Sequence, residues 1–164
     1  MKNISLALAL LVNCTTLGAD KVSDPDPGRF AKAIAKFQTK DASIKAVDSL
    51  TLFTGSSSIR MWKSMADDFP DRKTLNRGFG GSHLSDVLHY FDILVTRHKP
   101  KTIVLYCGEN DLWSGKPPQQ VLADFETFAK RVHEKFPKTR IYYIACKPSP
   151  KRWEKWDVYE KCNR

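Results

Sequence analysis

Hydrophobic residues along the chain alternate between the spacing of amphipathic helices and the short continuous runs of buried strands. Phe30, Ile34 and Phe37 stand four and three residues apart, which predicts a first helix. The same spacing predicts a helix over residues 84–95 and another over residues 117–136, where two prolines can open the first turn.

Four runs of strand length alternate with these helices. They cover residues 49–54, 74–76, 102–106 and 140–145, and a short helix over residues 59–65 separates the first two. The third run is apolar throughout, as expected for a strand with helices on both faces of its sheet. The alternation predicts a parallel, doubly wound α/β sheet whose ligand site lies beyond the carboxyl ends of the strands.

The first residues differ from the rest of the chain, whose 164 residues otherwise fit one globular domain. Lys2 is followed by an apolar run from Ile4 to Val12 and by small residues up to Ala19, the layout of a secretory signal peptide. We therefore expect residues 20–164 to form the domain and the protein to be secreted or periplasmic. The run is too short to span a bilayer, so stable membrane insertion is not expected.

The cysteines do not form a recognisable framework. Cleavage after Ala19 leaves three of them without C-x-x-C spacing, which argues against a zinc ribbon and against a set of disulfides. Cys107 and Cys146 end apolar runs and are expected to be small core residues. Lipid anchoring through Cys14 is a minor alternative, because Asn13 stands where such anchoring sites carry a smaller residue.

The net charge of +9 comes from Lys and Arg residues scattered through the predicted helices rather than gathered in one tract. Without aromatic residues interleaved in a basic stripe, and without a nucleic-acid motif, we expect no nucleic-acid partner. Attraction to an anionic polysaccharide or membrane surface stays open.

Residue types that enzymes use in catalysis directly follow three of the predicted strands. The first strand leads into Ser57, the second into a glycine-rich turn that ends at Gly81, and the third into Asn110. They offer a hydroxyl at a strand-to-helix turn, a backbone amide open to close approach, and a side-chain amide that donates without titrating. Because parallel strands end at one edge, we expect a shared site with a nucleophile and two oxyanion donors.

Each of these residues also fits an ordinary structural role. Ser57 can cap the helix that starts near Ile59, Gly81 can be a plain turn glycine, and Asn110 can hold a loop through its own backbone. Their joint occurrence at three strand ends favours the shared site.

The three segments resemble the motifs of the SGNH, or GDSL-type, hydrolases, a family of esterases and acylhydrolases with a flavodoxin-like three-layer α/β/α fold. The family's G-D-S matches residues 55–57, its N-x-G-x-x-G matches residues 76–81, and its G-x-N-D matches residues 108–111. Residues 58–62 and 147–153 are also similar to a bacterial branch of this family. The resemblance covers most of the chain that follows the leader.

The resemblance implies a serine-dependent ester hydrolase that acts through an acyl-enzyme. Ser57 would attack the ester carbonyl, while its own N–H, the N–H of Gly81 and the amide of Asn110 would hold the oxyanion. No cofactor and no metal is implied, and the substrate would be a small-molecule, carbohydrate or lipid ester. His83 lies near the glycine turn and is a candidate substrate contact without a counterpart in the family.

The sequence departs from the family pattern in two places. Ser56 stands where an aspartate usually precedes the nucleophile, which is tolerable because that aspartate is not the base. The family's base is a histidine in a C-terminal D-x-x-H segment after a fifth strand, and no such segment follows the fourth strand here. We therefore expect the last strand and helix to be missing, the fourth strand to be an exposed edge, and the chain as written to be nearly inactive.

A histidine elsewhere in the chain is a weak substitute. Asp86 to His89 spells D-x-x-H, but it lies within a predicted helix, where a rise of ~1.5 Å per residue carries His89 about 10 Å from Gly81.

The alternative function is that of a non-catalytic binding module. Such a module would be either a silent relative of these hydrolases or a flavodoxin-like binder of phosphate or flavin that uses the hydroxyls of residues 54–58 together with Arg60. This alternative leaves Gly81 and Asn110 without a role, and the chain has no G-x-G-x-x-G or P-loop spacing.

Overall fold

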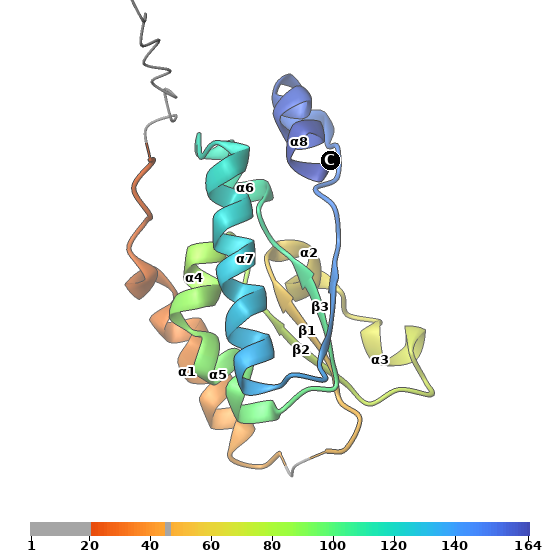
Figure 1. Ribbon diagram of the computed structural model, residues 1–164. Helices are drawn as coiled ribbons and strands as arrows, with labels where there is room; N and C mark the ends of the chain where they lie inside the picture. The colour runs from red at the N-terminus through yellow and green to blue at the C-terminus, as the bar shows by residue number, and fades with distance from the viewer. Residues whose placement is uncertain (1–20, 45–46) are drawn as a thin grey trace, which may run out of the picture.

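A computed structural model describes residues 21–44 and 47–164 (Figure 1). The predicted signal peptide and Cys14 lie outside the described residues, so both stay predictions. Within the described ranges, none of the helices combines the length and hydrophobicity that a membrane span requires.

The sheet has four parallel strands in the order β2-β1-β3-β4. The strands are β1 (Thr51–Gly55), β2 (Thr74–Gly78), β3 (Thr102–Tyr106) and β4 (Arg140–Tyr143). The predicted parallel α/β fold is therefore confirmed, with strand ends within a few residues of those expected. Gly55 pairs in register with both Gly78 and Tyr106, so β1, β2 and β3 end level with one another at the same edge.

The helices follow the strands as predicted, but two of them are shorter than the hydrophobic pattern indicates. The helical segments are η1 (Pro27–Phe30), α1 (Ala31–Asp41), α2 (Ser57–Met61), α3 (Met65–Asp68), α4 (Leu84–His89), α5 (Phe91–Leu94), η2 (Thr96–His98), α6 (Glu109–Trp113), α7 (Pro118–Lys135), η3 (Pro150–Lys155) and α8 (Trp156–Asn163). The single helix predicted over residues 59–65 is wrong, because Trp62 leaves the helical region with a ψ of 85°. The helix predicted over residues 84–95 is interrupted at Tyr90, whose ψ is 17°.

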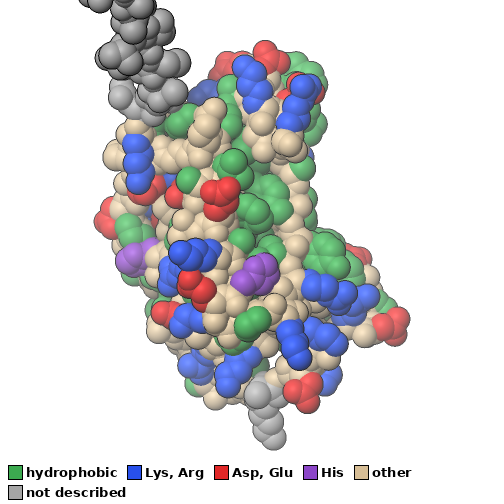
Figure 2. Space-filling view, viewed as in Figure 1, with side chains coloured by type: hydrophobic (Ala, Val, Ile, Leu, Met, Phe, Trp, Pro, Cys, Tyr) green, Lys and Arg blue, Asp and Glu red, His purple; other side chains and the backbone are tan. Residues whose placement is uncertain are grey.

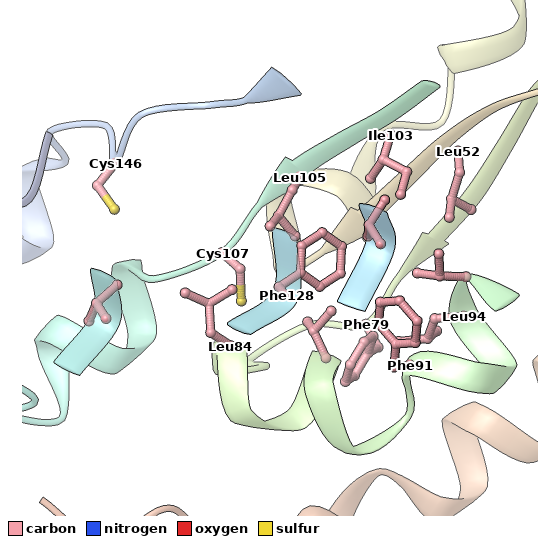
Figure 3. Close-up of a cluster of buried hydrophobic side chains, with 14 of the residues drawn as sticks. Leu52, Phe79, Leu84, Phe91, Leu94, Ile103, Leu105, Cys107, Phe128 and Cys146 are labelled. Atoms are coloured by element: carbon pink, nitrogen blue, oxygen red, sulfur yellow. The ribbon is translucent and has the colours of Figure 1, made fainter. Parts of the chain in front are cut away.

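The main core lies between one face of the sheet and the helices α1, α4, α5 and α7 (Figures 1 and 3). Its fully buried members come from the strands and from the inner faces of these helices: Leu52, Ile103, Leu105, Leu84, Val87, Phe91, Leu94 and Phe128. Burying each such side chain stabilises the fold by about 1.5–3 kcal/mol. Cys107 and Cys146 are also buried and free, which confirms them as core residues.

The second face of the sheet is covered only in part. Ile59 and Met65, from α2 and α3, pack against Phe53 under the β1 side of this face. Towards β4 the face is open: Tyr142 is 53% exposed and Ile144 is 38% exposed. A cavity of about 400 Å³ lies on this part of the sheet.

Strand β4 is an edge of the sheet among the described residues, in line with the exposed fourth strand expected from the sequence. Beside it, a groove along α7 is lined by Phe125, Ala129 and Ile141. Figure 2 shows hydrophobic surface alongside α7 in this region. The C-terminal helix α8 packs on α6 and α7 at the end of the sheet where the candidate site lies (Figure 1).

Candidate active site

The ends of β1, β2 and β3 are tied together by backbone hydrogen bonds. The N–H of Ser56 donates to the carbonyl of Tyr106 over 2.8 Å, and the N–H of Phe79 donates to the carbonyl of Gly55 over 2.8 Å. Gly55 has a φ of 113°, and a Cβ there would lie 2.1 Å from the Tyr106 oxygen. Only glycine fits at this point, so the loops after the three strands lie directly against one another.

Ser56, not Ser57, caps helix α2. Its buried Oγ accepts a hydrogen bond from the N–H of Ser57 over 2.6 Å and another from Nδ2 of Asn110 over 2.9 Å. The capping role considered for Ser57 is therefore wrong. Ser56 supplies a hydrogen-bond acceptor at the position where the family pattern has an aspartate, and two donors converge on its single oxygen.

Ser57 is the first residue of α2 and is half-buried. Among the residues that the structure describes, its hydroxyl forms no hydrogen bond, so the oxygen is not committed to the fold. Its N–H, which the family resemblance assigns to the oxyanion, is engaged by Ser56.

Gly81 lies two residues beyond buried Phe79, in an exposed turn with a φ of 87°. A Cβ at this position would meet nothing within 4 Å, and the Gly81 N–H forms no backbone hydrogen bond within the described ranges. The positive φ favours glycine, and the amide is free to donate. Gly81 and Ser57 line the same cavity of about 630 Å³.

Asn110 lies in the first turn of α6 and reaches both other loops. Its Nδ2 donates to Ser56 Oγ and, over 3.1 Å, to the carbonyl of Ser82. The side chain thus contacts the residue before Ser57 and the residue after Gly81. Its hydrogen bonds run to two neighbouring loops rather than to its own, so the role of holding only its own loop is wrong.

Arg152 is a neighbour of Asn110 that the sequence analysis did not identify. From η3, its guanidinium donates to Asn110 Oδ1 over 3.1 Å and to Glu109 Oε1 over 3.2 Å, and it lies over the ring of Trp113. Arginine has donors only, so the amide oxygen must face Arg152 and the amide NH₂ must face the strand ends. The sequence singles out the segment around Arg152 only by its resemblance to a bacterial branch of the family. No residue spacing indicates that Arg152 contacts Asn110.

A buried cluster of charged side chains links the two loops that carry Gly81 and Asn110. Asp111 accepts from the backbone N–H of Leu84 over 3.1 Å and from Nζ of Lys116 over 3.0 Å, which joins α6 to the first turn of α4. Burial alone would lower the pKa of Lys116, but the carboxylates of Asp111, Asp24 and Asp124 outweigh burial and raise it. Lys116 is therefore charged in the fold.

His83, the predicted substrate contact, belongs to this cluster. It is nearly buried, with Nδ1 3.6 Å from an oxygen of Asp111. Burial lowers the pKa of His83 below its ordinary value of 6.5, and Asp111 offsets only part of that effect. The imidazole is therefore neutral at pH 7, and its contact with substrate stays a prediction.

The pKa of His83 leads to an expected pH dependence of stability. The unfolded chain takes up a proton near the ordinary value of 6.5, whereas folded His83 does so only at lower pH. The stability that neutral His83 contributes to the fold is therefore fully present above about pH 6.5 and is lost as the pH falls further. Denaturant unfolding at about pH 7.5 and pH 5.5 should give a smaller loss of unfolding free energy for His83→Gln than for the unmodified protein. Equal losses in the two proteins would contradict this.

The other histidines lie elsewhere. His89 is exposed on α4 and packs edge-on against Tyr90, and His133 is exposed on α7. His98 lies 3.3 Å from Asp41. Within the described residues, no histidine forms a hydrogen bond with Ser57, so they provide no base for it.

The alternative phosphate or flavin site requires free hydroxyls in residues 54–58, and the structure shows which of them are free. Thr54 is fully buried and donates its hydroxyl to the carbonyl of Arg77, and the Ser56 hydroxyl is occupied as described above. Two of the hydroxyls that would hold a phosphate are therefore unavailable. A cavity of about 770 Å³ is lined by Ser49, Leu50 and Lys73, which precede β1 and β2 at the opposite end of the sheet.

Comparison with known proteins identifies the family of the chain. The family model of GDSL-like lipases and acylhydrolases matches residues 48–164. No protein with a curated description matches the chain at a significant level.

Solved structures have the same fold. A Streptococcus pneumonia protein provisionally named a platelet activating factor is 25% identical, with a TM-score of 0.66 over 82% of this chain and 67% of its own. A GDSL-like lipase from Bacteroides thetaiotaomicron is 20% identical, with a TM-score of 0.63 over 84% and 67%. An acetyl xylan esterase is 14% identical, with a TM-score of 0.58 over 70% of each chain. The chain spans about two thirds of the first two structures, and by its sequence match it belongs to the GDSL-like lipase/acylhydrolase family.

Proposed function

We propose that this protein is a serine-dependent ester hydrolase in which Ser57 is the nucleophile, and Gly81 and Asn110 donate hydrogen bonds to the oxyanion. One observation carries the proposal. Nδ2 of Asn110 donates to Ser56 Oγ over 2.9 Å and to the carbonyl of Ser82 over 3.1 Å, so one side chain joins the residue before Ser57 to the residue after Gly81. A side-chain amide and the N–H of Gly81, placed beside a serine hydroxyl, suit the stabilisation of an oxyanion that forms at that serine.

The reaction follows from these positions. The Ser57 oxygen attacks the ester carbonyl and gives its proton to water, and the carbonyl oxygen becomes an oxyanion held by the Gly81 N–H and the Asn110 amide. The alcohol leaves with a proton taken from water, and a second water molecule then hydrolyses the acyl-serine to release the acid. The substrate is a small-molecule, carbohydrate or lipid ester, and the signal-peptide layout of residues 1–19 supports action outside the cytoplasm.

No histidine in residues 21–44 and 47–164 forms a hydrogen bond with Ser57, and this sets the expected rate. A serine hydroxyl without a base is a poor nucleophile at neutral pH. An enzyme that has lost a triad member still accelerates the reaction ~1,000- to 10,000-fold over water. We therefore expect the 164-residue polypeptide to turn over esters slowly.

The experiment is hydrolysis of p-nitrophenyl acetate by the purified polypeptide. Release of p-nitrophenolate should exceed the buffer rate in proportion to protein concentration, and mass spectrometry should find one acetyl group on the peptide that contains Ser57. Heat-denatured protein is the control. Tight ester binding with no release and no acetyl group would instead indicate the non-catalytic binding module.

Arg152 takes part in the proposed function as a positioning residue. It fixes the Asn110 amide with its NH₂ towards the oxyanion, and its charge draws electrons towards Oδ1, which strengthens donation from Nδ2.

Arg152→Met is expected to lower the acylation rate about tenfold, because losing a hydrogen bond from a charged donor costs about 1.5 kcal/mol. The Michaelis constant should change little, since the bond acts on the donor in the transition state. Arg152→Lys keeps a charged donor and should retain more activity, although lysine lacks the fork that binds Asn110 and Glu109 together. An unchanged acylation rate in Arg152→Met would contradict this role.

A further inference from the structure

A basic cavity opens beside Ser57. It has a volume of about 630 Å³ and lies between α1, α2 and the glycine turn after β2. Of the residues that the structure describes, five cations and no carboxylate line it: Arg29, Lys32, Lys36, Lys40 and Arg60. Four of the five lie within residues 29–40, and the fold brings Arg60 to them, next to the candidate nucleophile.

Three of these cations form a stripe on α1. Lys32, Lys36 and Lys40 follow one another at intervals of four residues, so their side chains lie on one face of the helix. Each pair of like charges at this spacing destabilises a helix by about 0.2–0.5 kcal/mol. None of the three forms an ion pair within the described residues, so an anion that enters the cavity would relieve the repulsion.

Arg60 connects this stripe with the candidate site. It lies three residues after Ser57 on α2, and its guanidinium lies against Gly80: a Cβ there would be 2.5 Å from Arg60 Nε. Glycine at this position leaves room for the arginine beside Gly81. A cation thus lies close to both the proposed nucleophile, Ser57, and the proposed oxyanion donor, Gly81.

Aromatic rings complete the cavity. Phe30, Phe37 and Phe79 line it, and the rings of Phe30 and Phe79 pack edge-to-face with centroids 5.0 Å apart. Of the five lining cations, only Arg29 forms an ion pair within the described part of the chain, with the carboxylate of Asp86. The cavity therefore offers an apolar surface for a carbon chain together with unpaired positive charge for an anionic end.

We propose that this cavity binds the negatively charged end of the substrate, so that the preferred substrates are esters that also carry a carboxylate or a phosphate. The inference rests on the proposed role of Ser57, because the cavity opens next to that residue. The net positive charge of the chain supports it, since a concave basic site concentrates anionic ligands.

The test measures binding rather than hydrolysis. Ser57→Ala protein is titrated at low salt with monomethyl adipate, which is anionic, and with dimethyl adipate, its neutral match, and binding is followed by NMR chemical shifts. The monoester should bind about tenfold more tightly, which corresponds to about 1.4 kcal/mol. Salt at about 0.5 M should remove most of this preference, because it screens exposed charges. Equal affinities at low salt would overturn the proposal.

Matched variants locate the effect. Lys32→Gln combined with Lys36→Gln should reduce the preference for the anion to about twofold or less. Lys99→Gln combined with Lys101→Gln removes the same charge from exposed positions before β3 and should leave the preference unchanged. A preference that survives the first pair of substitutions, or that is lost with the second, would overturn the proposal.

A third probe identifies the anion. Monobutyl phosphate that displaces monomethyl adipate more strongly than hexanoate does would assign the cavity to phosphate, and the reverse order would assign it to carboxylate; either order supports an anionic substrate. Because hydrolysis is not measured, failure of Ser57 as a nucleophile leaves these affinities unaffected. The two proposals can therefore fail separately.

Discussion

Ser57→Ala is expected to abolish acetylation of the protein by p-nitrophenyl acetate and the part of the protein-dependent hydrolysis that passes through the acyl-enzyme. The part that comes from the oxyanion donors and from binding alone should remain. The residue is half-buried at the start of α2, and its hydroxyl is uncommitted to the fold among the described residues. Removing the hydroxyl removes the atom that forms the acyl-enzyme, so acetylation of this peptide should disappear completely. The measurement combines initial rates with mass spectrometry of the acetylated protein.

The neighbouring serine is the matched control. Ser58 has similar exposure on the same helix, so Ser58→Ala removes an equivalent hydroxyl without touching the proposed nucleophile. Its rate should stay within about twofold of the unmodified protein, as usual for substitutions away from reacting atoms. Retained acetylation of this peptide in Ser57→Ala, or an equal loss of acetylation in both variants, would contradict the assignment of Ser57.

Asn110→Ala is expected to lower the acylation rate ~100- to 1,000-fold, the usual effect of removing one oxyanion donor. The Michaelis constant should change little, because the amide is proposed to bind the negative oxygen of the transition state rather than the neutral carbonyl. Initial rates over a range of ester concentrations separate the two constants.

Asn110 also joins two loops, so the stability of the variant must be measured alongside its rate. Its Nδ2 bonds to Ser56 and Ser82, and their loss should cost about 0.5–1.5 kcal/mol per bond. Denaturant unfolding provides this value, and a cooperative transition shows that the variant is folded at the assay temperature. A loss that appears only in the Michaelis constant would contradict the oxyanion role.

The strands could be predicted from the sequence because their signals are local. Residues 102–106 form a continuous apolar run, and the strand they predict matches β3. The helix breaks at Trp62 and Tyr90 could not be predicted, because the hydrophobic period continues through both positions. Their backbone angles are set by tertiary contacts: Trp62 packs on Phe53 and Phe69, and Tyr90 donates its hydroxyl to Pro27.

Much of the candidate site was also predictable, for a topological reason. In a parallel sheet, residues that directly follow neighbouring strands must meet at one edge, and Asn110 does contact the loops of both Ser57 and Gly81. The contact of Arg152 with Asn110 joins residues 42 positions apart without a shared strand end. The acceptor role of Ser56 depends on a side-chain direction, which spacing does not specify.

The most direct test of the convergence of Ser57, Gly81 and Asn110 is a crystal structure of the protein after reaction with diisopropyl fluorophosphate. The account predicts phosphorus bonded to Ser57 Oγ, with the phosphoryl oxygen about 2.7–3.1 Å from both the Gly81 nitrogen and Asn110 Nδ2. A phosphoryl group on another residue, or one on Ser57 whose oxygen points away from both donors, would contradict it.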